Sequence, residues 1–191
     1  LMNQAAMQRI LLNTKSLTII EAEKCSGEKV ARHPLVLQLN ERIKGGLESI
    51  AHNIYRRMAN LKMYEFGNVY QFDPEADASE KVLAQYSEYT ALGLWITGND
   101  IEGNWAQKER KTTVFDLKAT VENIFARLGI SANEVVTEQA SDDIFSANLS
   151  IKNRGGKSVG SLGVVKYALL KKMDIEQPVY FAEFNWDTII K

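Results

Sequence analysis

The chain has 191 residues, 45% of them hydrophobic and 25% charged, which is the profile of an ordinary globular protein large enough to bury a core. Its formal net charge of −1 argues against a free-standing nucleic-acid-binding module, because such modules are usually more basic. The single cysteine, Cys25, excludes a disulfide framework within the chain and is typical of a reducing compartment.

The sequence also argues against a membrane protein. No apolar run approaches the roughly 20 residues that span a bilayer, and the first residues lack the basic and apolar regions of a secretion signal. We therefore expect a cytoplasmic protein without membrane association. Because the chain begins at Leu1 rather than at an initiator methionine, we also expect it to be a piece of a longer protein.

In chain order, the first expected elements are a helix over residues 2–13, a strand over 17–23 and a short ambiguous run over 36–39. From Asn40 the apolar period becomes helical, and the apolar stripe of residues 40–57 is made of Ile43, Leu47, Ile50, Ala51 and Ile54. Gly45 and Gly46 predict either a break in this helix or close packing against it.

Two strong strands follow, over residues 61–72 and 90–97, with an acidic connection from Asp73 to Glu80 between them. Both faces of the second strand carry apolar residues, as in a central strand. Thr113 and Asp116 predict a capping box, and Gly129 ends the helix that this box opens. The remaining expected elements are strands over residues 135–138, 147–151, 158–165 and 178–185, and a helix over 166–173.

The order of these elements shows no regular alternation of strand and helix. We therefore predict an α+β fold with a largely antiparallel sheet flanked by helices, in one domain over residues 1–191.

Motifs for chemistry are sparse. His33 and His52 have no partner at metal-ligand spacing, and the glycines match neither a P-loop nor a dinucleotide fingerprint. The basic residues Lys108, Arg110 and Lys111 are interpreted as an exposed surface rather than a phosphate site. We expect Trp105 to anchor its loop on the domain, with contact to a partner as the alternative.

Several segments match one family in order. They are residues 46–53 with Arg56-Arg57, Tyr64-Glu65-Phe66-Gly67-Asn68-Val69-Tyr70, Leu92-Gly93-Leu94-Trp95-Ile96-Thr97-Gly98, Phe115-Asp116-Leu117-Lys118, Val159-Gly160-Ser161-Leu162-Gly163 and residues 179–184. Together they resemble the core of the β subunit of bacterial phenylalanyl-tRNA synthetase over residues 45–190. The resemblance leaves residues 1–40 unexplained, and the family's Asn-Pro and late His-Pro are absent here.

The resemblance implies a class II aminoacyl-tRNA synthetase-like fold, over about residues 40–190, that has lost catalysis. It also implies a catalytic α subunit as partner in an α2β2 heterotetramer, tRNA(Phe) as a partner of the whole enzyme, and ATP with Mg²⁺ at the catalytic subunit. Catalytic class II domains carry an ATP-binding arginine two residues before the glutamate that matches Glu65, and Met63 stands there instead. A thioether cannot neutralise a phosphate, so we predict no catalytic, cofactor or metal residues in this chain and no activation of phenylalanine by it alone.

The predicted docking surface for the α subunit comprises Ile43, Leu47, Ile50, Ile54, Tyr64 and Phe66. A second hypothesis is direct tRNA contact by Arg56, Arg57 and Lys62. A third is a free-standing enzyme with a small-molecule site of its own, assembled from Glu65, Asn68 and Arg154.

Overall fold

The computed structural model describes residues 41–72, 86–131, 134–140 and 142–190. The elements predicted over residues 2–13, 17–23 and 36–39 lie outside this part of the chain, as do Cys25, His33 and the acidic connection of residues 73–80.

One antiparallel sheet organises the described residues. Its strand order is β1-β2-β8-β7-β6-β5, and every neighbouring pair is antiparallel. The predicted α+β class with a largely antiparallel sheet is confirmed. The strands are β1 (Leu61–Phe72), β2 (Tyr86–Thr97), β5 (Val135–Ala140), β6 (Phe145–Asn153), β7 (Ser158–Val165) and β8 (Val179–Asn185).

The two strongest sequence patterns form the longest pair in the sheet. β1 and β2 stay in register from Leu61 opposite Thr97 to Phe72 opposite Tyr86. β2 lies between β1 and β8, and all residues from Ala91 to Thr97 are buried. The prediction of a central strand covered on both faces is therefore confirmed.

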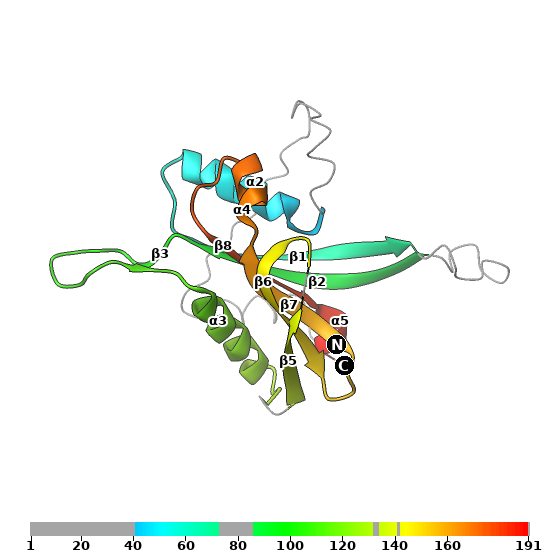
Figure 1. Ribbon diagram of the computed structural model, residues 1–191. Helices are drawn as coiled ribbons and strands as arrows, with labels where there is room; N and C mark the ends of the chain where they lie inside the picture. Colours follow the sequence, from blue (N-terminus) through cyan, green and yellow to red (C-terminus); the bar gives the residue numbers. More distant parts are fainter. Residues whose placement is uncertain (1–40, 73–85, 132–133, 141, 191) are drawn as a thin grey trace.

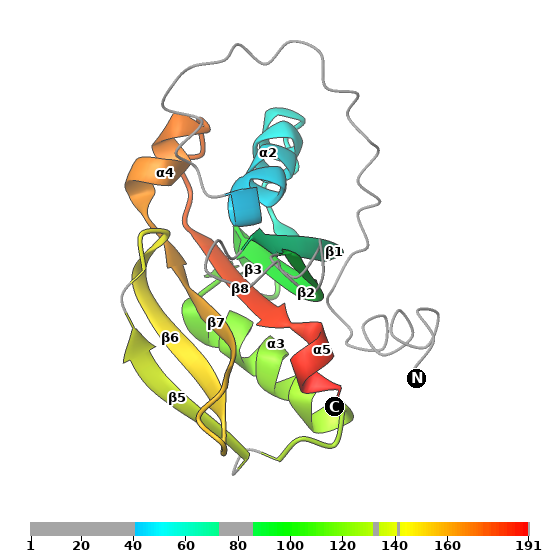
Figure 2. The same cartoon turned by 90° about the vertical axis from the view of Figure 1, so that its right-hand side faces the viewer.

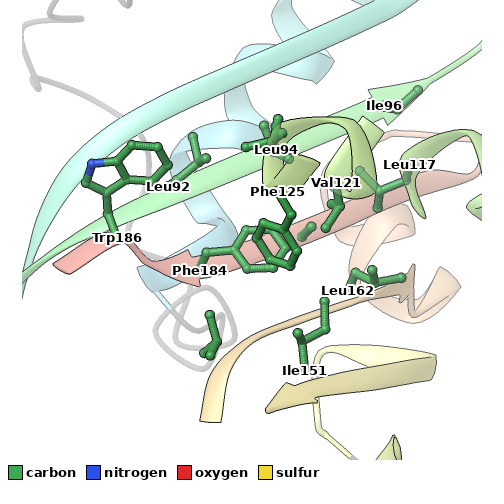
Figure 3. Close-up of a cluster of buried hydrophobic side chains, with 13 residues drawn as sticks. Leu92, Leu94, Ile96, Leu117, Val121, Phe125, Ile151, Leu162, Phe184 and Trp186 are labelled. Carbon is green, nitrogen blue, oxygen red and sulfur yellow. The ribbon is translucent and has the colours of Figure 1, made fainter. Parts of the chain in front are cut away.

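One face of the sheet is covered by α3 (Val114–Arg127) and α5 (Trp186–Ile189). Apolar side chains of α3 pack there against side chains from the middle strands, as Figure 3 shows for Phe125 beside Phe184. The capping box predicted for α3 is present, because Asp116 Oδ2 accepts hydrogen bonds from the backbone N–H and the hydroxyl of Thr113.

The other face is covered at one end by α2 (Glu41–Tyr55) and α4 (Tyr167–Lys172), as Figure 2 shows. Ile43, Leu47 and Ile50 of α2 are 0% exposed, in a cluster that also holds Trp95 and Phe181. The prediction that these three residues form a docking surface was therefore wrong. An apolar stripe fits a partner and a core equally well by pattern, and here the chain's own sheet covers it.

The two glycines in α2 have different surroundings. A side chain at Gly45 would meet nothing within 4 Å, whereas a Cβ at Gly46 would lie 2.2 Å from Cε2 of Trp95. The predicted close packing is therefore present at Gly46, and the helix is not broken at this pair.

A second, two-stranded sheet joins β3 (Asn99–Ile101) to β4 (Arg110–Lys111). We call Asn99–Lys111 the arm, because it projects well beyond the main sheet in Figure 1. Trp105 in the arm is 99% exposed, so the expectation that it anchors its loop on the domain was wrong.

Candidate functional site

A hollow of about 990 Å³ lies on the sheet face that α2 covers only in part. Gly45, Gly46 and Trp95 bound it where α2 crosses the sheet, and the strands supply most of the remaining lining. The polar side chains of this lining are Glu65, Asn68, Tyr89, Asp142, Asn148, Ser150, Ser158, Ser161, Glu183 and Asn185.

The charged side chains in the described lining of this hollow are all acidic. Its described lining includes the carboxylates of Glu65, Asp142 and Glu183 and no lysine or arginine. Glu183 is the most buried of the three, at 9% exposed. Phosphate binding in proteins depends on cationic or amide donors, and the described lining supplies no cationic side chain.

Met63 is the residue that the sequence resemblance matches to the ATP-binding arginine of catalytic class II domains. Its side chain is 4% exposed and belongs to the apolar cluster with Leu61, Trp95 and Phe181. This position therefore offers no cationic side chain to a phosphate.

Tyr64 and Phe66, predicted as part of a docking surface, lie on the opposite sheet face. Their rings meet edge to face at 6.2 Å, and Phe66 meets Trp186 in the same way at 5.0 Å. Both are partly buried against the cluster under α3, and burial raises the pKa of the Tyr64 hydroxyl. The two residues support the core and remain partly exposed, so their contact with a partner stays a prediction.

The three residues predicted to contact tRNA have different surroundings. Arg56 and Arg57 are exposed just beyond the end of α2, and Arg57 has a positive φ of 65°. Lys62, in contrast, is held by Asp100, with 2.5 Å between Nζ and Oδ1. Lys62 is therefore committed to an ion pair at the root of the arm.

The predicted small-molecule site of Glu65, Asn68 and Arg154 is assembled only in part. Glu65 and Asn68 both line the hollow, and Asn68 donates a hydrogen bond to Glu88 at 2.6 Å. Arg154 lies in the turn between β6 and β7 and is not part of that lining.

Sequence reasoning missed two features of the hollow, the buried Glu183 and the role of Trp95. Glu183 lies in an otherwise apolar strand of the pattern Val-Tyr-Phe-Ala-Glu-Phe, and a charge at a core position was the available signal. Trp95 stacks on Phe181 at 4.9 Å and fills the end of the hollow under α2. The glycines at 46 and 93, both in contact with its ring, were the signal for that large side chain.

The outer face of α2 remains exposed. Gly45, Glu48, His52 and Tyr55 follow one another at helical spacing along this face, and Tyr55 is 88% exposed. Met58, just beyond the helix, is also exposed. We call Glu48, His52, Tyr55 and Met58 the α2 outer face.

Comparison with known proteins identifies the family. The model of the phenylalanyl tRNA synthetase beta chain CLM domain matches residues 40–186. The chain belongs to this family. The resemblance found in the sequence is thereby confirmed, and the chain is a domain of the type found in phenylalanine–tRNA ligase β subunits.

Bacterial β subunits are similar to this chain over a limited part of their own length. The phenylalanine–tRNA ligase β subunit of Bacteroides fragilis is 49% identical over 147 residues, which are 77% of this chain and 18% of that protein. The Porphyromonas gingivalis β subunit is 40% identical over 146 residues, 76% of this chain and 18% of that protein. The chain thus spans about a fifth of the length of these curated relatives.

Among solved structures, a pyrrolysyl-tRNA synthetase from Desulfitobacterium hafniense superposes with a TM-score of 0.58 at 14% identity. The match covers 97% of this chain and 68% of that one. At this identity the likeness concerns the fold alone, and it confirms the class II synthetase-like architecture.

The described residues include no membrane-spanning helix and no cluster of metal-ligand side chains. None of their helices is both long and apolar enough to cross a membrane. No group of three or more His, Cys, Asp or Glu side chains within the described ranges could hold a metal ion.

Proposed function

We propose that this chain is a noncatalytic class II-like domain that supports aminoacylation of tRNA(Phe) by docking the catalytic α subunit of a phenylalanine–tRNA ligase. The observation that supports its noncatalytic part is the buried Met63, together with a hollow whose described charged side chains are all acidic. In the whole enzyme, an α2β2 heterotetramer of the cytoplasm, ATP and Mg²⁺ would bind at the catalytic subunit.

The α2 outer face is the surface that we propose for docking. It replaces the buried stripe of α2, because a partner can meet only side chains that the domain leaves exposed. Tyr55 and Met58 offer apolar area there, while Glu48 and His52 are polar side chains that tolerate solvent in the free chain. Exposed aromatic and methionine side chains are enriched in protein interfaces.

The noncatalytic part of the proposal is tested by ATP–pyrophosphate exchange with phenylalanine. The isolated chain should show no exchange above background, and the complete enzyme should show it. Exchange by this chain alone would overturn the proposal, and would favour the third hypothesis of a site with its own chemistry.

The docking part is tested with a double variant of the outer face, His52→Glu with Tyr55→Glu, in the β chain produced with its α subunit. We expect at least a tenfold loss of association, because charges enter a desolvated contact. Ala126→Glu on the exposed side of α3 is the matched control and should leave association unchanged. Unaltered association of the double variant, with an unchanged melting temperature, would exclude this surface.

A further inference from the structure

The arm ends in a turn that holds an indole in solvent. The backbone N–H of Asn104 donates to the carbonyl of Gln107 at 2.9 Å, and that of Gln107 donates to the carbonyl of Asn104 at 3.3 Å. Asn104 Oδ1 also accepts from the N–H groups of Ala106 and Gln107, each at 2.9 Å. Trp105 is thereby fixed at the tip of a closed four-residue turn.

The root of the arm is fastened to the main sheet. Asp100 accepts hydrogen bonds from Lys62 of β1 and from Arg110 of β4, and Arg110 also pairs with Asp116 of α3 at 2.9 Å. On the other side of the root, Asn60 Oδ1 accepts from the N–H of Asn99 at 2.8 Å. The hydrogen bond from Lys62 is the main cause of a lowered pKa at Asp100, so this carboxylate stays ionised at neutral pH.

Exposure of the apolar Trp105 ring to water is unfavourable, whereas an exposed indole on an ordered arm is well suited to contact a partner. Burial of a tryptophan side chain in an apolar pocket is strongly favourable, and the backbone that carries Trp105 is already ordered by the turn. Of the three tryptophans in the chain, Trp95 and Trp186 are buried in the two core clusters. Trp105 therefore has no role in the packing of the described domain.

The charge of the arm favours a protein over a nucleic acid as its partner. Residues 99–111 contain three acidic side chains, Asp100, Glu102 and Glu109, and three basic ones, Lys108, Arg110 and Lys111, so their net formal charge is zero. A segment that stacks on nucleotides usually carries an excess of positive charge for the backbone phosphates.

The position of the arm points to one protein partner. Its root joins the end of α2 through Asn60, which contacts both Asn99 and Glu102. Gly98 at the same root packs on the backbone carbonyl of Ala59, next to the exposed Met58. The root of the arm thus lies next to the end of α2 that carries Tyr55 and Met58, and the arm projects from there beyond the main sheet (Figure 1).

We propose that the arm is a second docking element for the catalytic α subunit, with Trp105 inserted into an apolar pocket of that subunit. This inference rests on the proposed function and adds a contact separate from α2. Asn104 is the positioning residue of the contact, since its side chain closes the turn that presents the indole.

The test measures association of the full-length β chain with its α subunit. Trp105→Ala should weaken binding about tenfold to a hundredfold, Trp105→Phe should recover part of the loss, and Asn104→Ala should weaken binding a few-fold. The melting temperature of each free variant should stay within error of the parent. Val136→Ala, an exposed apolar position on the far edge strand β5, is the control and should have no effect.

Hydroxyl-radical footprinting read at Trp105 by mass spectrometry identifies the occupant. Protection that appears only when the α subunit is added supports the inference. Protection in the free full-length β chain would assign the indole to another part of the same polypeptide. Protection by tRNA alone, lost at high salt, would assign it to RNA. Either result overturns the inference, as does unchanged association of Trp105→Ala.

The two proposals fail in different ways. If the α2 outer-face variant loses binding and Trp105→Ala does not, the arm is excluded while the proposed function stands. If neither variant changes binding, the proposed docking surface fails together with the arm.

Discussion

Replacing Gly46 by alanine tests the packing that closes one end of the hollow. In most helices this change is favourable by about 1 kcal/mol, because glycine is a poor helix former. Here the new Cβ would lie 2.2 Å from Cε2 and 2.5 Å from Nε1 of Trp95. Carbon atoms in contact prefer about 3.5–4.0 Å, so the helix or the indole must move by more than an ångström.

The indole already has close neighbours on other sides. Trp95 stacks on Phe181, and the ring also lies against Gly93, where a Cβ would be 2.4 Å from Cη2. Overpacking of this kind costs about 1–3 kcal/mol and sometimes more. We take about 3 kcal/mol as the cost and subtract the propensity gain of about 1 kcal/mol, which predicts a net destabilisation of about 2 kcal/mol.

Gly45→Ala is the matched control, since it lies in the same helix and meets nothing within 4 Å. It should raise stability by up to about 1 kcal/mol. Urea denaturation should therefore separate the two variants by about 3 kcal/mol, and Gly46→Ala should melt about 4–8 °C below the parent. Equal stability of the two variants would refute the argument that Trp95 fixes the identity of residue 46.

Two further changes test the electrostatics and the sheet. Burial alone would raise the pKa of Asp116, but hydrogen bonds from Arg110 and from the capping residue lower it to about 2. Since this lies below the unfolded value, the carboxylate stabilises the fold at neutral pH and loses that effect as the pH falls from about 5 to about 2. Asp116→Asn should lower the free energy of unfolding by about 1–2 kcal/mol at pH 7. In urea titrations, the difference in unfolding free energy between variant and parent should become smaller toward pH 2. A difference that stays constant with pH would contradict the stabilising role of the ionised Asp116. Gly160→Ala should destabilise the fold by about 2 kcal/mol or more, because its Cβ would lie 2.2 Å from the backbone carbonyl of Glu183. Gly67→Ala is the control, since its Cβ would meet nothing within 4 Å. It should leave the melting temperature almost unchanged in the same thermal melt.

Local patterns predicted the sheet well because strands and caps depend on neighbours in sequence. β1 and β7 have the predicted ends, and β2 begins four residues before the predicted start. The strand order could not be predicted, because it depends on contacts between distant segments such as β2 and β8. The arm was missed as a hairpin, since its strands are three and two residues long and leave almost no periodic signal.

The site was predicted less well than the fold, for a reason visible in Leu47 and Trp105. Hydrophobicity shows that a side chain prefers to leave water, and it does not show whether the chain itself or a partner provides the cover. Leu47 was assigned to a partner and is buried in the core, while Trp105 was assigned to the core and is almost fully exposed. The spacing of Leu47 in a helical stripe is common to cores and interfaces, and only the sheet packed against it distinguishes them.

Met63 links the proposed noncatalytic role to the stability of the apolar cluster under α2. An arginine at position 63 would place a guanidinium among Leu61, Trp95 and Phe181 at a nearly inaccessible position. A buried charge without a partner costs several kcal/mol, and a catalytic domain offsets that cost only when the site is hydrated or holds a phosphate. With methionine there, α2 can pack tightly on Trp95 and the cluster can close. Methionine at position 63 thus favours a closed core, as the proposed noncatalytic role requires.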